Sequence, residues 1–114
     1  MIFVTGPLFA GKSEYIQSAL GLDEDAFAAC SIRDVQELAD CEDLEALAEE
    51  LAKKRVVIAT EVGGGVVPTD PAEREKRERA GRLACLLAGR ADTVIRVCCG
   101  LPQLLKGDWP CGSC

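Results

Sequence analysis

The segment from Gly6 to Ser13 is the part of this chain most suited to chemistry. It reads Gly-Pro-Leu-Phe-Ala-Gly-Lys-Ser and matches the phosphate-binding pattern G-x-x-x-x-G-K-[S/T]. A β-prone run, Ile2–Thr5, precedes it and a helix-compatible run, Glu14–Leu20, follows it, which is the context that the pattern requires. Backbone N–H groups, the lysine and the hydroxyl would then hold a nucleoside triphosphate and Mg²⁺. The residues expected to bind ATP or GTP in this phosphate-loop motif are Gly6, Pro7, Leu8, Phe9, Ala10, Gly11, Lys12 and Ser13.

A carboxylate and further positive charge are expected near the motif, because phosphoryl transfer needs both. Glu61 directly follows the β-branched run Val56–Thr60, so it could hold Mg²⁺ through water or activate an attacking hydroxyl. A surface glutamate that merely ends a strand is the alternative. Arg74 and Arg77 follow a glycine-rich segment and could meet the transferred phosphate, although i,i+4 ion pairing on a solvated helix explains them equally well. The candidate catalytic residues are therefore Lys12, Glu61, Arg74 and Arg77, and the candidate metal ligands are Ser13 and Glu61.

Composition limits the size and the partners of the protein. A chain of 114 residues, 48% hydrophobic, can build one core. We expect one domain over residues 1–106 and a tail over 107–114. The net charge of -6 opposes general affinity for nucleic acids and anionic membranes. Because no apolar run approaches the length of a membrane span and no leader pattern is visible, a cytoplasmic location is expected.

The alternation of strand and helix patterns predicts how these residues are positioned. We expect an α/β fold: a small, P-loop NTPase-like, three-layer domain with a mainly parallel sheet of three to four strands. The expected strands are Ile2–Thr5, Val56–Thr60 and Asp92–Cys99, with a possible short one at Ala26–Cys30. The expected helices cover Glu14–Leu20, two short pieces or one broken helix within Asp34–Lys54, and about Asp70 or Pro71 to Gly89. A short segment, Gln103–Lys106, follows a break at Gly100.

Seven cysteines do not favour a disulfide framework, because the count is odd and the periodicity is that of an ordinary globular domain. Cys30, Cys41 and Cys85 stand among apolar residues and are expected in the core. A C-x-x-C pair ends the chain at 111–114. A zinc site there would have to draw on the adjacent cysteines at 98–99, whose spacing is poor for chelation.

The motifs together resemble one enzyme family. They are Ile2–Gly6 running into Gly11–Ser13, then Glu61–Pro68, then Arg74–Arg82, and Gly100-Leu101-Pro102 leading to Lys106. The chain is similar to the adenosylcobinamide kinase and adenosylcobinamide-phosphate guanylyltransferase family of cobalamin biosynthesis. The resemblance implies a P-loop sheet, ATP or GTP as donor, phosphorylation of the aminopropanol hydroxyl of adenosylcobinamide, and GMP transfer through a guanylylated histidine. It also implies a homotrimer with sites near subunit interfaces.

The chain departs from that family in its middle. Family members are longer, and between the first helix and Val56 they carry the guanylylated histidine and a further strand with an acidic residue. This chain contains no histidine, so covalent guanylyl transfer by that route is not expected. We predict an adenosylcobinamide kinase-like protein that acts on a corrinoid. The alternative is a non-catalytic P-loop homologue that binds nucleotide.

Overall fold

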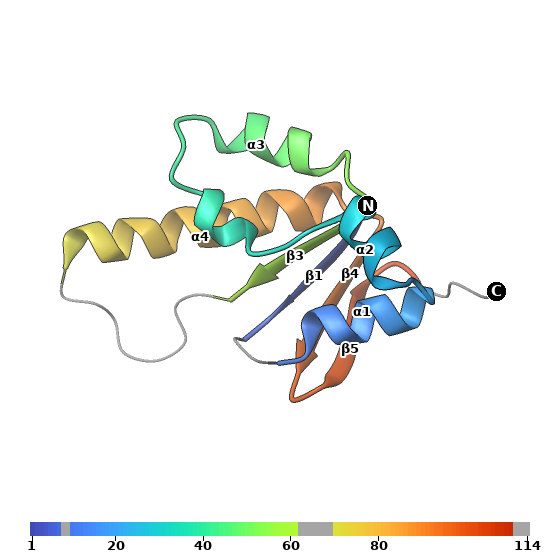
Figure 1. Cartoon of the computed structure of the whole chain (residues 1–114). Helices are drawn as coiled ribbons and strands as arrows, with labels where there is room; N and C mark the ends of the chain where they lie inside the picture. Colours follow the sequence, from blue (N-terminus) through green and yellow to red (C-terminus); the bar gives the residue numbers. More distant parts are fainter. Residues whose placement is uncertain (8–9, 62–69, 111–114) are drawn as a thin grey trace.

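A five-stranded sheet forms the centre of the protein, with helices on both faces (Figure 1). The computed structural model describes residues 1–7, 10–61 and 70–110. The strands, in the spatial order β2-β3-β1-β4-β5, are β1 (Ile2–Gly6), β2 (Ser31–Ile32), β3 (Val56–Thr60), β4 (Thr93–Cys98) and β5 (Leu101–Lys106). The pairs β2–β3, β3–β1 and β1–β4 are parallel, and β5 is antiparallel to β4. The predicted fold class is confirmed, with one strand more than the upper number expected.

Two helical layers cover the sheet. The layer on one face consists of α1 (Lys12–Leu20) and α2 (Glu24–Cys30), and the layer on the other consists of the 3-10 turn η1 (Val35–Leu38), α3 (Leu44–Leu51) and α4 (Pro71–Arg90) (Figure 1). Consecutive residues of β1 point to opposite layers: Phe3 belongs to the cluster under α3 and α4, and Val4 to the cluster under α1. This alternation explains the continuous apolar runs of the central strands, because both faces are buried.

The prediction of a strand at Ala26–Cys30 is wrong, because these residues form most of α2 (Glu24–Cys30). The Asp23 side chain accepts a hydrogen bond of 2.7 Å from the backbone N–H of Ala26 and so caps the helix. Short apolar runs do not separate strand from helix, and alanine favours the helix once it is capped. The edge strand β2 begins at Ser31, directly after the helix.

We expect Asp23→Ala to lower the free energy of unfolding by about 1 kcal/mol, the usual contribution of an N-cap side chain. Asp23→Asn is the matched control, because asparagine caps helices about as well as aspartate. Urea unfolding followed by circular dichroism would measure both variants. Equal destabilisation by the two substitutions would contradict a capping role.

The other predicted helices are confirmed. The interrupted segment within 34–54 resolves into η1 and α3, and the Asp43 side chain caps α3 by accepting from the Ala46 N–H at 3.1 Å. Asp70 caps α4 by accepting from Ala72 N–H at 3.0 Å, with Pro71 in the first turn. The segment after Gly100 is also strand: it forms β5, and Cys99 and Gly100 make the turn between β4 and β5 with φ of 54° and 74°.

The cysteines differ in part from expectation. Cys85 is exposed, whereas Cys30 and Cys41 are half-buried. The core role expected for Cys85 is wrong because it lies off the buried stripe of α4, which consists of Ala80, Leu83 and Leu87. The pair at 111–114 lies outside the described residues. In the part of the chain that the structure describes, no helix is both long and apolar enough to cross a membrane.

Candidate functional site

The candidate site lies where the parallel strands end. β3, β1 and β4 are adjacent and parallel, so their carboxyl ends meet at one edge of the sheet. Gly6, Glu61 and Arg96 stand at or beside these ends. In open α/β sheets, ligands bind in the crevice outside the carboxyl ends of the strands. This edge is therefore where the chain's chemistry is expected.

The phosphate-loop motif connects the end of β1 to the start of α1. A Cβ atom at Gly6 would lie 2.1 Å from the backbone oxygen of Val97, so only glycine lets β1 end against β4 in this way. Gly11 has φ of 83° and stands at the N-cap of α1 without a side-chain cap. The first turn of this nine-residue helix therefore has N–H groups free for an anion. Leu8 and Phe9 lie outside the described residues.

The side chain of Lys12 reaches back to Pro7, near the start of the motif. Its side chain is almost fully buried, with the residue 8% exposed, and its Nζ donates a hydrogen bond of 2.7 Å to the backbone oxygen of Pro7. Burial lowers the pKa of Lys12, while the negative charges of Asp34, Glu61 and Glu14 oppose that effect. The ammonium group is thus held by a carbonyl near the start of the motif, in a field set by acids from several elements.

Glu61 is fixed to the end of β1 by its backbone and paired by its side chain. Its N–H donates to the backbone oxygen of Gly6 at 2.8 Å. Its two carboxylate oxygens accept from the guanidinium of Arg96, at 2.6 Å from Nε and at 3.0 Å from a terminal nitrogen. Both side chains are 37% exposed. This bidentate bond raises the pKa of Arg96, and the ion pair spans from the end of β3 across β1 to β4.

Sequence reasoning missed Arg96. It stands in β4, opposite Thr5 of β1 in the register, among the apolar residues Val94, Ile95 and Val97. A single charge in the second half of a buried strand was the available signal, because only the carboxyl end of such a strand opens to solvent.

Sequence reasoning also missed Asp34. This residue follows the short β2, has φ of 55° and precedes η1. Of the three acids whose negative charge raises the pKa of Lys12, Asp34 has the largest effect. The middle of the chain thus contains a short strand, β2, that is followed directly by a polar stretch with a carboxylate, Asp34.

Two of the predicted catalytic residues, Arg74 and Arg77, lie in the first half of α4. Arg74 is exposed and Arg77 is half-buried, both in the amino-terminal half of α4 that projects beyond the sheet (Figure 1). Their neighbour Arg79 donates to the backbone oxygen of Ala39 at 2.9 Å. Over residues 1–7, 10–61 and 70–110, the arginine bonded to Glu61 is Arg96.

The turn between β4 and β5 is hydrogen-bonded to the phosphate-loop motif. The N–H of Gly100 donates to the backbone oxygen of Ala10 at 2.8 Å.

Within the described ranges, no group of three or more His, Cys, Asp or Glu side chains could hold a metal ion alone. A divalent ion here would need ligands from a bound nucleotide, as is usual for Mg²⁺.

Comparison with known proteins gives a family for the chain. Residues 26–105 match the family described as cobinamide kinase / cobinamide phosphate guanyltransferase. The match covers more than two thirds of the sequence and includes Asp34, Glu61 and Arg96, whereas the phosphate-loop motif precedes it. No curated protein matches the chain in a sequence search. The family match is enough to assign the chain: it belongs to the cobinamide kinase / cobinamide phosphate guanyltransferase family of cobalamin biosynthesis.

Proposed function

We propose that this protein transfers the terminal phosphate of ATP or GTP to a hydroxyl of a cobinamide-type acceptor. One observation carries the proposal: the Glu61–Arg96 pair stands at the same sheet edge from which the phosphate-loop motif leaves β1. A carboxylate, a guanidinium and a lysine-bearing loop at one edge are the groups that phosphoryl transfer uses.

The motif supplies the nucleotide site. The free N–H groups at the start of α1 face the phosphates, and Lys12 exchanges the Pro7 oxygen for phosphate oxygens. That exchange replaces a neutral acceptor by a charged one and so strengthens the hydrogen bond. Positioning and electrostatic stabilisation then provide most of the rate acceleration.

The residues at the edge suit Mg²⁺. The Ser13 hydroxyl and the Glu61 carboxylate are hard oxygen donors of the kind that Mg²⁺ prefers, and Asp34 adds a second carboxylate beside Lys12. When bound, the ion supplies positive charge to the phosphate oxygens. Glu61 would hold it once its carboxylate is released from Arg96, whose guanidinium bonds both carboxylate oxygens.

Transfer to the acceptor is then a direct displacement. The acceptor hydroxyl oxygen bonds to the terminal phosphorus, the bond from that phosphorus to the bridging oxygen breaks, and the nucleoside diphosphate leaves. The hydroxyl proton passes to a Glu61 carboxylate oxygen. The chain has no histidine, so the proposal covers the kinase reaction alone and excludes a guanylylated histidine. The trimeric assembly and the cellular location expected from the sequence stay predictions.

Incubation of the purified chain with γ-labelled ATP or GTP, Mg²⁺ and adenosylcobinamide tests the proposal. We expect label on the corrinoid, separated by chromatography. Nucleotide binding without label transfer would instead support the non-catalytic homologue, and absence of nucleotide binding would remove both.

A further inference from the structure

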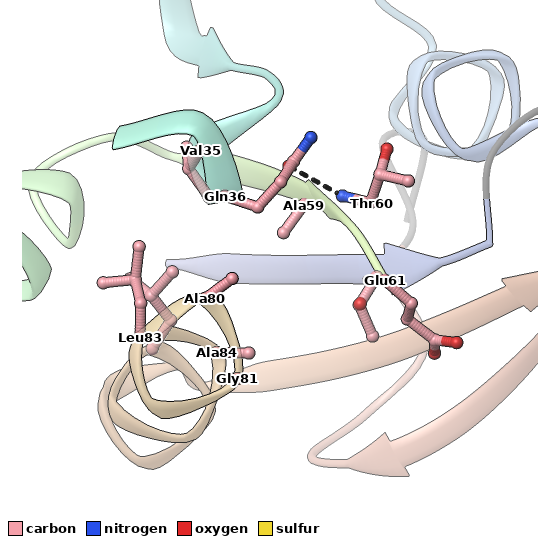
Figure 2. A pocket seen from close by; sticks show the side chains of 11 residues that line it. Val35, Gln36, Ala59, Thr60, Glu61, Ala80, Gly81, Leu83 and Ala84 are labelled. Carbon is pink, nitrogen blue, oxygen red and sulfur yellow. Dashed lines mark hydrogen bonds between the residues drawn. The ribbon is translucent and has the colours of Figure 1, made fainter. Parts of the chain in front are cut away.

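The carboxyl end of β3 is held by hydrogen bonds on both of its edges. The N–H of Glu61 donates to the backbone oxygen of Gly6 in β1 at 2.8 Å. The N–H of the preceding residue, Thr60, donates to the side-chain oxygen Oε1 of Gln36 at 2.9 Å (Figure 2). Successive N–H groups of a strand point to opposite neighbours. Gln36 therefore lies where a strand on the other side of β3 from β1 would pair.

Gln36 takes the place of a neighbouring strand that is too short. The edge strand β2 consists of Ser31–Ile32 and pairs with the first two residues of β3, Val56–Val57, so it ends before the level of Thr60. A backbone N–H that is buried without an acceptor is costly, and the bond to Gln36 is partly buried. The side chain of Gln36 thus completes the pairing of β3 at the residue before Glu61.

Packing does not fix this end of β3 on the α4 face of the sheet. A pocket of about 110 Å³ lies between η1, the ends of β1 and β3, and α4 (Figure 2). On the α4 side it is lined by small residues such as Ala80 and Ala84, and Glu61 lines it where β3 ends. Because the described side chains leave this space open, the backbone bonds at Thr60 and Glu61 define where the end of β3 lies.

The 3-10 turn η1 is a firm support for Gln36. Val35, the residue before Gln36, is fully buried in the cluster under α3 and α4. The turn also follows Asp34 directly. Asp34 and Glu61 are two of the three acids whose negative charge raises the pKa of Lys12. One short turn is thus joined to the first of these acids and, through the side chain of Gln36, to the strand end that carries the second.

We propose that Gln36 is a positioning residue that, by holding Thr60, sets where the Glu61 carboxylate lies at the edge of the sheet. It acts through the backbone of β3 and not on the reacting groups. Its effect on turnover rests on the proposed kinase function, in which Glu61 takes part. Its effect on the Glu61–Arg96 ion pair does not rest on that function, so the two effects can be tested apart.

Gln36→Leu and Gln36→Glu test the positioning role. Leucine removes the acceptor for the Thr60 N–H, whereas glutamate keeps an acceptor oxygen on a side chain of the same length. We expect Gln36→Leu to lower kcat about 10- to 100-fold, the scale of a small misplacement of a reacting group, with the nucleotide Kd within about twofold. Gln36→Glu should restore most of the kcat. Gln36→Asn, whose amide is one methylene shorter, replaces Gln36→Leu if that variant does not fold.

Gln17 offers a matched control. Its side chain also makes a partly buried hydrogen bond to the backbone, from Nε2 to the oxygen of Leu22 at 3.2 Å, but it lies in the second half of α1 and not beside β3. Gln17→Leu should therefore leave kcat unchanged. An equal loss of kcat in Gln17→Leu and Gln36→Leu would overturn the positioning role, as would a loss that Gln36→Glu does not reverse.

A second measurement does not depend on catalysis. The Nε–H of Arg96 donates to the Glu61 carboxylate at 2.6 Å, so its NMR resonance reports where that carboxylate lies. We expect this resonance to shift in Gln36→Leu and to stay near its wild-type position in Gln36→Glu and Gln17→Leu. Such a shift in a protein that transfers no phosphate would keep the positioning role and remove the kinase proposal. An unmoved resonance in folded Gln36→Leu would overturn the positioning role whether or not phosphate is transferred, and so would an unchanged kcat in an active protein.

Discussion

Lys12→Ala should weaken nucleotide binding about 10- to 100-fold, because a hydrogen bond to a charged group contributes about 1.5–3 kcal/mol. Lys12 is the buried cation of the described residues, and in the absence of ligand its Nζ donates to the Pro7 oxygen. Its loss therefore removes the charge that would meet the terminal phosphates. Turnover should fall by at least about a hundredfold, because that charge acts on the transferred group. Calorimetry with ATP and GTP measures the first effect and label transfer the second.

Two further variants define what Lys12 contributes. Lys54→Ala removes an exposed lysine beyond α3 and should leave nucleotide affinity unchanged.

Burial lowers the pKa of Lys12, so the Lys12 side chain keeps its proton to higher pH in the unfolded chain than in the folded one. The charge for phosphate binding is thus lost earlier than for a free lysine as pH rises. Affinity should decline on the alkaline side in the wild type, and Lys12→Arg should move that decline to higher pH. Equal affinity of Lys12→Ala and wild type would refute the nucleotide site.

The central strands could be predicted from the sequence because a strand that is buried on both faces is a continuous run of apolar, β-branched residues. Val56–Thr60 is apolar and β-branched at nearly every position, and it forms β3 as expected. The run Ala26–Cys30 lacks β-branched residues, and its alanines and cysteine are compatible with a helix or a strand. The cap by Asp23 favours the helix. Strand identity was readable where side chains are bulky and ambiguous where they are small.

The candidate site was predictable where a local motif defines it and not where strand order does. The pattern at Gly6–Ser13 needs no knowledge of the fold. The Glu61–Arg96 pair joins residues 35 positions apart. It forms because β3 and β4 lie on either side of β1, in a register that brings both residues to the same end of the sheet. Arg74 and Arg77 were selected by closeness along the chain, whereas Arg96 reaches Glu61 through the sheet.

Glu61→Gln should lower turnover by about a hundredfold or more with a modest change in nucleotide affinity, the scale of a positioned acid or base. Glutamine keeps the size of the side chain and one acceptor for Arg96, but it can neither take a proton nor bind Mg²⁺ as a carboxylate. The ion pair is half-exposed, and such pairs contribute at most about 1 kcal/mol to stability. The thermal midpoint should therefore change little, which separates a catalytic loss from unfolding. Glu45→Gln, an exposed site on α3, is the control, and unchanged turnover in Glu61→Gln would assign the acid elsewhere.

Arg96 distinguishes the two roles open to Glu61. If the carboxylate holds Mg²⁺, Arg96 competes with the ion for the same oxygens, at 2.6 and 3.0 Å. Arg96→Gln should then tighten Mg²⁺ binding in the nucleotide complex, measured by calorimetry, whereas Glu61→Gln should weaken it. If Glu61 acts only as a proton acceptor, neither variant should alter Mg²⁺ affinity. Opposite shifts in Mg²⁺ affinity would place the metal at Glu61, because a purely structural ion pair between β3 and β4 would lose the same contact in either variant.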